Sequence, residues 1–77
     1  MSDVEQRVRK VVAQVLKIDP ARIKSESRFV EDLGAESIQS VELIAAFEEE
    51  FDIEMDDEEA LGVKTFGNAV EFIEKLV

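Results

Sequence analysis

The chain of 77 residues contains no cysteine, no histidine, no tryptophan and no tyrosine, and it has only one proline. Without cysteine, neither a disulfide nor a thiolate metal site can form. Without histidine, the most common general base and metal ligand is missing. Because the chain has no cysteine thiol, any thiol chemistry must come from an added group. No apolar run approaches the roughly 18 residues that span a bilayer, and the N-terminus lacks a signal-peptide segment. We therefore expect a cytoplasmic protein without membrane association.

Negative charge is concentrated in one third of the sequence. Nineteen acidic residues outnumber nine basic ones, for a net charge of −10. Eleven of the acids lie between residues 36 and 61, where there is no Lys or Arg, whereas the remaining residues sum to +1. This distribution argues against nucleic acid and anionic membranes as partners and favours a basic protein surface. With 45% apolar residues, residues 1–77 are expected to form one globular domain.

Helical periodicity predicts an all-α fold, and no segment has the alternation of a strand. We expect helices at residues 3–17, 37–51 and from Thr65 to the end, with a short acidic helix at 56–61 that ends at Gly62. Ser2 and Glu5 have the spacing of a capping box. The prediction is a small four-helix bundle with three main helices, a short third helix and a long first loop. The expected core residues of the first and last helices are Val4, Val8, Val11, Val12, Val15, Leu16, Phe66, Ala69, Val70, Ile73, Leu76 and Val77.

The connection between the first two long helices, residues 18–36, is unusually long for a small domain, and long connections often carry function. Asp19 and Pro20 are a good start for one short turn, and Gly34 permits a backbone angle that other residues resist. Apolar side chains at four positions are expected to hold the loop on the bundle: Ile23, Phe29, Val30 and Leu33.

The helix at 37–51 has two apolar faces. At 100° per residue, one face is made by Leu43, Ile44, Phe47 and Phe51 and must point to the core. A second stripe lies well around the helix, and a helix in so small a bundle rarely buries two opposed faces. We expect it to be an exposed apolar strip with an acidic rim, made of Ile38, Val41, Ala45, Glu42, Glu48 and Glu49.

Ser37 lies at the expected start of this helix, after Gly34 and Ala35. Unpaired amides and the helix dipole favour an anion there, so a phosphate ester on Ser37 would be well accommodated. A serine nucleophile would need a nearby base, which this chain lacks. Taken alone, Ser37 could also be an ordinary N-cap.

The segment 32–43, with the sequence DLGAESIQSVEL, followed by FEEEF at 47–51, resembles the acyl carrier protein family. The resemblance extends to the valine-rich first helix, the proline-containing loop and the acidic short helix. The attachment motif of that family is Asp-Ser-Leu, which corresponds here to Glu36-Ser37-Ile38. The resemblance implies that Ser37 carries a 4′-phosphopantetheine arm. Glu36 and Ile38 depart from the motif, which could restrict recognition by the modifying transferase.

The resemblance also implies the mechanism and partners. A phosphopantetheinyl transferase would load the arm from coenzyme A with magnesium, and the arm would then hold acyl groups as thioesters. The protein would be a monomeric carrier, not an enzyme, serving fatty acid or related polyketide and lipid biosynthetic enzymes with basic docking patches. The expected partner contacts are Glu36, Ile38, Val41, Glu42, Ala45, Glu48, Glu49 and Met55.

Two other functional classes fit part of the sequence. An unmodified acidic helical adaptor that docks a basic partner would explain the charge, but not the Gly-Ala-Glu-Ser sequence; a hydrolase using a carboxylate pair is a more distant alternative. A calcium-binding EF-hand starting at Asp52 would need Gly at its sixth position and Glu at its twelfth, where this chain has Asp57 and Val63. We therefore expect no specific metal site.

Overall fold

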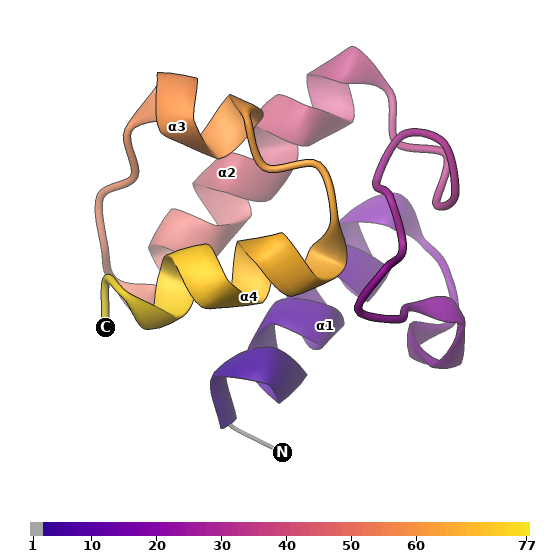
Figure 1. Cartoon of the computed structure of the whole chain (residues 1–77), viewed down its shortest axis with the longest axis horizontal. Helices are drawn as coiled ribbons and strands as arrows, with labels where there is room; N and C mark the ends of the chain where they lie inside the picture. The colour runs from indigo at the N-terminus through magenta and orange to yellow at the C-terminus, as the bar shows by residue number, and fades with distance from the viewer. Residues whose placement is uncertain (1–2) are drawn as a thin grey trace.

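The computed structural model describes residues 3–77, and its helices are shown in Figure 1. The order is α1 (Asp3–Leu16), a single 3₁₀ turn η1 (Pro20–Arg22), α2 (Ser37–Phe51), α3 (Asp57–Leu61) and α4 (Phe66–Glu74). Within the described residues, the only β-type pairing is an isolated bridge between Arg28 and Thr65. The predicted all-α fold with three main helices and a short third one is confirmed.

The ends of the helices follow the expected capping chemistry. Asp19 accepts a hydrogen bond from the Ala21 amide at the start of η1, and Asp56 accepts bonds from two amides at the start of α3. Thr65 accepts a bond from Asn68 N–H at the start of α4. α1 ends one residue earlier than expected, because Lys17 takes a left-handed conformation (φ 57°). The predicted capping box of Ser2 lies outside the described residues.

The core forms where α1 packs against α2 and α4. Its most deeply buried side chains come from all parts of the chain and are Val8, Val12, Ile23, Phe66 and Ile73. The predicted inner face of α2 is confirmed at Leu43, Phe47 and Phe51, which are buried, while Ile44 is half-buried. This core fixes α2 with its opposite face toward solvent.

Three positions differ from the expected core. Val30 is 55% exposed and does not hold the loop on the bundle, unlike Ile23, Phe29 and Leu33, which are buried. Leu76 and Val77 are 41% and 61% exposed, because α4 ends at Glu74 and the last residues leave the core. None of the helices in the described range 3–77 is both long and apolar enough to cross a membrane.

Candidate functional site

The loop that leads to Ser37 is anchored to the beginning of α4. The Phe29 amide donates to the Lys64 carbonyl (3.0 Å), and the Phe66 amide donates to the Ser27 carbonyl (2.9 Å). Gly67 N–H donates to the Ser25 carbonyl at 2.9 Å, an approach so close that a Cβ at Gly67 would lie 2.8 Å from that oxygen. The loop is therefore attached through its backbone to a helix that belongs to the core.

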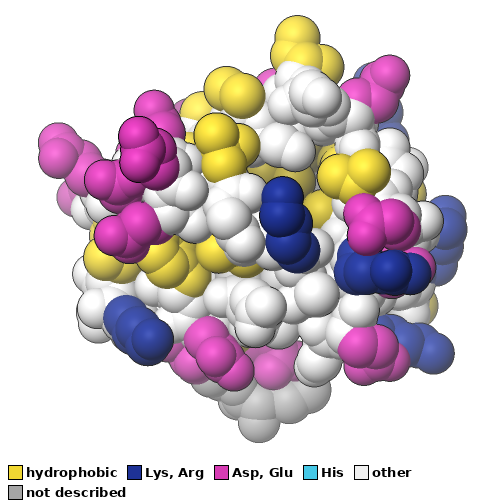
Figure 2. Space-filling model, turned by 45° about the horizontal axis from the view of Figure 1, so that its top comes forward, with side chains coloured by type: hydrophobic (Ala, Val, Ile, Leu, Met, Phe, Trp, Pro, Cys, Tyr) yellow, Lys and Arg dark blue, Asp and Glu magenta, His cyan; other side chains and the backbone are white. Residues whose placement is uncertain are grey.

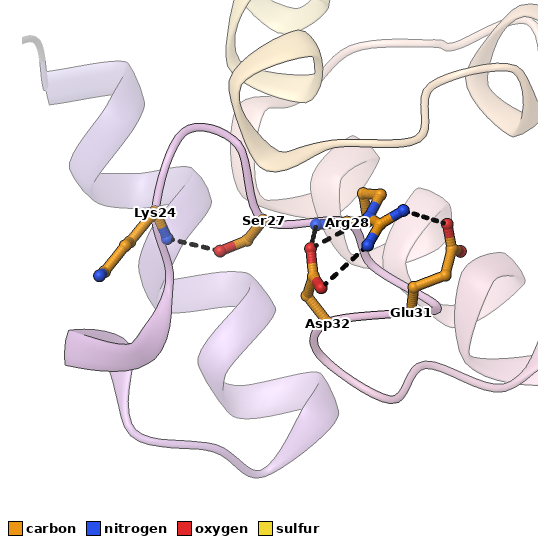
Figure 3. A network of polar contacts seen from close by, with 5 residues as sticks. All are labelled: Lys24, Ser27, Arg28, Glu31 and Asp32. Atoms are coloured by element: carbon orange, nitrogen blue, oxygen red, sulfur yellow. Dashed lines mark hydrogen bonds and ion pairs between the residues drawn. The ribbon is translucent and has the colours of Figure 1, made fainter.

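A second set of contacts closes the loop on itself (Figure 3). Asp32 accepts hydrogen bonds from the backbone and the side chain of Arg28, at 2.8 and 3.2 Å, and Glu31 lies 3.6 Å from the same guanidinium. The side-chain hydrogen bond from Arg28, followed by the backbone bond, lowers the pKa of the exposed Asp32. Ser27, the buried polar side chain of this loop, accepts a bond from the Lys24 amide (2.9 Å).

Gly34 makes the turn immediately before α2. Its φ of +74° is in the left-handed region, which explains why glycine is present at this position. The next residue, Ala35, is buried and its amide donates to the Phe29 carbonyl at 2.8 Å. Glu36 is the N-cap of α2, and its amide donates to the side-chain carbonyl of Gln39 at 2.9 Å.

Ser37 is the first helical residue of α2 and is exposed. It is not the N-cap, because Glu36 occupies that position, and its hydroxyl forms no hydrogen bond with any described residue. The amides of Ser37 and Ile38 lie in the first turn, where the helix itself provides no acceptor and the dipole is positive. A phosphate ester on this oxygen would thus meet open space and unpaired amides, and the site fits such a group.

A hollow opens beside Ser37, and we call it the Ser37 hollow. It lies where the loop, the start of α2 and the segment between α3 and α4 meet. Most of its lining is apolar or neutral, with one acidic and one basic side chain. The lining residues are Val30, Ala35, Glu36, Ser37, Ile38, Ser40, Leu61 and Lys64.

The solvent side of α2 combines apolar and acidic side chains, as expected. Ile38 and Val41 are 70% and 59% exposed, and Glu42, Ala45 and Glu49 are also exposed. Figure 2 shows hydrophobic side chains open to solvent along the upper part of the molecule, with acidic side chains gathered on the side where α3 lies in Figure 1. We call the five residues Ile38, Val41, Glu42, Ala45 and Glu49 the exposed face of α2.

Glu48 and Met55 differ from the other predicted partner contacts. Both are half-buried, and the Glu48 carboxylate accepts a hydrogen bond from the Met55 amide at 2.9 Å. This bond crosses the turn after α2, in which Asp52 is left-handed (φ 54°). Glu48 therefore has an internal role in holding the α2–α3 connection, which sequence periodicity did not reveal.

A small cavity of about 70 Å³ lies behind the exposed face of α2. It is lined by apolar side chains of α2, α3 and α4, including Leu43, Phe47, Ala60, Ala69 and Phe72. Ser40, Leu61, Lys64 and Val30 line both this cavity and the Ser37 hollow. The two spaces thus adjoin each other.

In the described part of the chain, no three His, Cys, Asp or Glu residues are grouped so that they could hold a metal ion.

Comparison with known proteins identifies the family of this chain. The family model "Phosphopantetheine attachment site" matches residues 6–73. The acyl carrier protein of Phenylobacterium zucineum (strain HLK1) is 51% identical over 75 residues, covering 97% of this chain and 95% of that protein. The acyl carrier protein of Caulobacter vibrioides is 51% identical over 73 residues, covering 95% and 94%. The chain belongs to the acyl carrier protein family.

A solved structure agrees with this assignment. A putative acyl carrier protein from Mycobacterium tuberculosis superimposes with a TM-score of 0.87 at 28% identity, covering 94% of this chain and 96% of that one. The protein is therefore a carrier of acyl groups for biosynthesis, and its cofactor is phosphopantetheine. As a member of this family it interacts with a phosphopantetheinyl transferase and with biosynthetic enzymes.

Proposed function

We propose that Ser37 is the residue that carries the phosphopantetheine arm of this acyl carrier protein. The observation that supports the assignment best is the state of its hydroxyl, which is exposed at the first position of α2 and forms no hydrogen bond with any residue in the described range 3–77. Capping, the usual role of a serine at a helix start, is performed by Glu36 and Gln39 instead. Ser37 also lies in the segment that resembles the attachment motif of the family.

The residues around Ser37 provide binding and orientation. When bound, the arm supplies a terminal thiol that holds the acyl group as a thioester. The first-turn amides of α2 favour the negative charge of a phosphate ester on the Ser37 oxygen. Gly34 and the loop contacts with α4 hold Ser37 at the rim of the Ser37 hollow. The chain contains no histidine or cysteine, and we assign it no catalytic step of its own.

We also propose that partner enzymes dock on the exposed face of α2, together with Glu36 and Met55. Exposed apolar side chains beside unpaired carboxylates would match a basic patch with an apolar centre. Glu48 belongs to this set only in part, because its carboxylate is already bonded to the Met55 amide. On this proposal residues 1–77 act as one monomeric acyl-carrier domain in the cytoplasm, loaded and unloaded by enzymes of fatty acid or related biosynthesis.

The attachment site is tested by intact-protein mass spectrometry after incubation with coenzyme A, magnesium and a broad-specificity phosphopantetheinyl transferase. We expect the wild type to gain one phosphopantetheine group and Ser37→Ala to gain none. Ser40→Ala is the matched control, because Ser40 lines the same hollow and should leave loading intact. A loaded Ser37→Ala protein would overturn the site. No loading of the wild type by several transferases would instead favour the unmodified acidic adaptor.

The docking face is tested by association kinetics with the same transferase. Glu42→Lys should slow association, and more strongly at low salt, because long-range attraction to a basic patch is lost. Glu26→Lys makes the same change of charge in the exposed loop, away from α2, and is the control. Equal association rates for the two variants would contradict docking on α2.

A further inference from the structure

Among the described residues, Lys64 is the only basic side chain that lines the Ser37 hollow. In the sequence it is the first Lys or Arg after residues 36–61, a range of 26 residues that contains neither. The residue lies between α3 and α4, just before the Thr65 cap. Its position at the hollow therefore depends on the tertiary fold and not on sequence proximity to Ser37.

The backbone of Lys64 is held in place while its side chain is free. The Lys64 carbonyl accepts the hydrogen bond from Phe29 N–H (3.0 Å), and Thr65 forms the isolated bridge with Arg28. The side chain is exposed, and within residues 3–77 it forms no ion pair; the ion pairs there involve Arg7, Arg9 and Arg28. The flexible Lys64 side chain, attached to a fixed backbone, can thus place its ammonium at the rim of the hollow.

We propose that Lys64 pairs with the phosphodiester of the arm on Ser37 and holds the base of the arm over the hollow. This inference depends on the proposed attachment at Ser37. The phosphodiester adds a negative charge next to Glu36, the other charged residue of the hollow, so attachment alone would increase repulsion. The Lys64 ammonium opposes that repulsion, and its four-carbon stem lets it follow the phosphate without a change of the backbone.

The pairing also determines the direction in which the arm leaves Ser37. Lys64 lies on the α3–α4 side of the hollow and also lines the 70 Å³ cavity behind it, as does Leu61. A phosphate held by Lys64 is therefore directed toward Leu61 and the cavity. The arm base and the docking face would then meet only at Glu36 and Ile38, which line the hollow.

The experiment compares the Lys64 side chain in the apo and loaded proteins by NMR. Mass spectrometry first establishes that one phosphopantetheine is present and that Ser37→Ala has none. The Cε and Hε signals of Lys64 should shift on loading, because its ammonium then lies beside the phosphodiester. This change of the signals should disappear in about 1 M salt, where the screening length is roughly 3 Å. Lys75, at the far end of α4, should not change.

A second readout uses the phosphorus nucleus of the loaded protein. Lys64→Gln should shift the ³¹P signal of the phosphodiester and remove its salt dependence, whereas Lys75→Gln, with the same change of charge, should do neither. If the wild type is loaded but the Lys64 signals are identical in the apo and loaded forms, this inference is wrong and the attachment site stands. If the wild type is not loaded at Ser37, the proposed function fails, and the inference with it.

Discussion

Glu48 and Glu49 are neighbours on α2 with the same chemistry, but the structure assigns them different roles. The Glu48 carboxylate accepts the Met55 amide at 2.9 Å and is half-buried, whereas Glu49 is exposed and forms no hydrogen bond within the described residues. Glu48→Ala should therefore destabilise the fold and Glu49→Ala should not. Both changes remove one negative charge from the same helix, so any general relief of repulsion is common to the two.

The magnitude follows from the bond that is lost. Leaving an amide without its partner costs about 1–3 kcal/mol when it is buried, and Met55 is only half-buried, so we expect about 1 kcal/mol for Glu48→Ala. In a domain of this size that loss lowers the melting temperature by about 4–8 °C. Glu49→Ala should stay within about 0.5 kcal/mol of the wild type, as is usual for surface positions. Glu48→Gln keeps a carbonyl acceptor and should fall between the two.

Thermal unfolding followed by circular dichroism at 222 nm measures these differences. Amide hydrogen exchange gives a local check, because Met55 N–H should exchange roughly fivefold faster in Glu48→Ala, the factor that corresponds to 1 kcal/mol. Equal melting temperatures for the Glu48→Ala and Glu49→Ala variants, with unchanged exchange at Met55, would refute the internal role of Glu48. Glu48 would then belong with the other acids of the exposed face of α2.

Three further predictions concern the loop and the charge of the fold. Gly67→Ala should destabilise by about 1–3 kcal/mol although alanine favours helices, because its Cβ would lie 2.8 Å from the Ser25 carbonyl; an unchanged or higher denaturant midpoint would contradict this. Arg28 lowers the pKa of Asp32 in the folded protein. The stability that the Asp32 carboxylate contributes is therefore present above its unfolded-state pKa, near 3.9, and is lost as the pH falls through its folded-state pKa. Asp32→Asn should therefore flatten the acid side of the stability curve, and an unaltered curve would rule out the contribution. Finally, the melting temperature should rise when sodium chloride is increased from 10 to 500 mM, because salt screens the repulsion among the acids of residues 36–61. A flat or falling melting temperature would show that this repulsion does not dominate.

Much of the fold could be predicted because local signals and tertiary packing agree. The bounds of α2 at Ser37–Phe51 match the prediction, since Gly34 separates the loop from an unbroken helical pattern. The short turn at Pro20 and the start of α4 after Thr65 match for a similar reason, because the capping side chains are adjacent in sequence to the amides they bind. The exposed stripe of α2 followed from the angle between its two apolar faces.

The errors arose in the irregular loop and after the end of α4. Val30 is in an irregular loop, where apolar character alone does not determine which side faces the core. Leu76 and Val77 continue the helical pattern, but α4 has already ended at Glu74 and both side chains are exposed. Two further features depend on how the chain folds back on itself, and sequence spacing does not predict them. They are the hydrogen bond from the Met55 amide to Glu48 and the position of Lys64 at the Ser37 hollow.

The arrangement of ion pairs explains how so acidic a protein can remain folded and still attract a partner. Arg7 pairs with Glu50 at 2.9 Å and lies over the Phe51 ring, Arg9 pairs with Glu5, and Arg28 pairs with residues of its own loop. Of the eleven acids between residues 36 and 61, Glu50 alone forms an ion pair within the described structure. A basic partner can therefore neutralise the exposed face of α2 without breaking an internal pair.

This separation has a measurable consequence for salt. Screening removes repulsion among the unpaired acids, which favours folding, and it removes attraction to a basic partner, which disfavours docking. Folding stability and association rate should thus depend on ionic strength with opposite signs in the same protein. Removal of a single carboxylate separates the two roles. For a docking acid such as Glu42 the association rate should fall while stability is kept, whereas for an acid with an internal role such as Glu48 stability should fall. The change in stability therefore distinguishes acids that hold the fold from acids proposed to recruit partners.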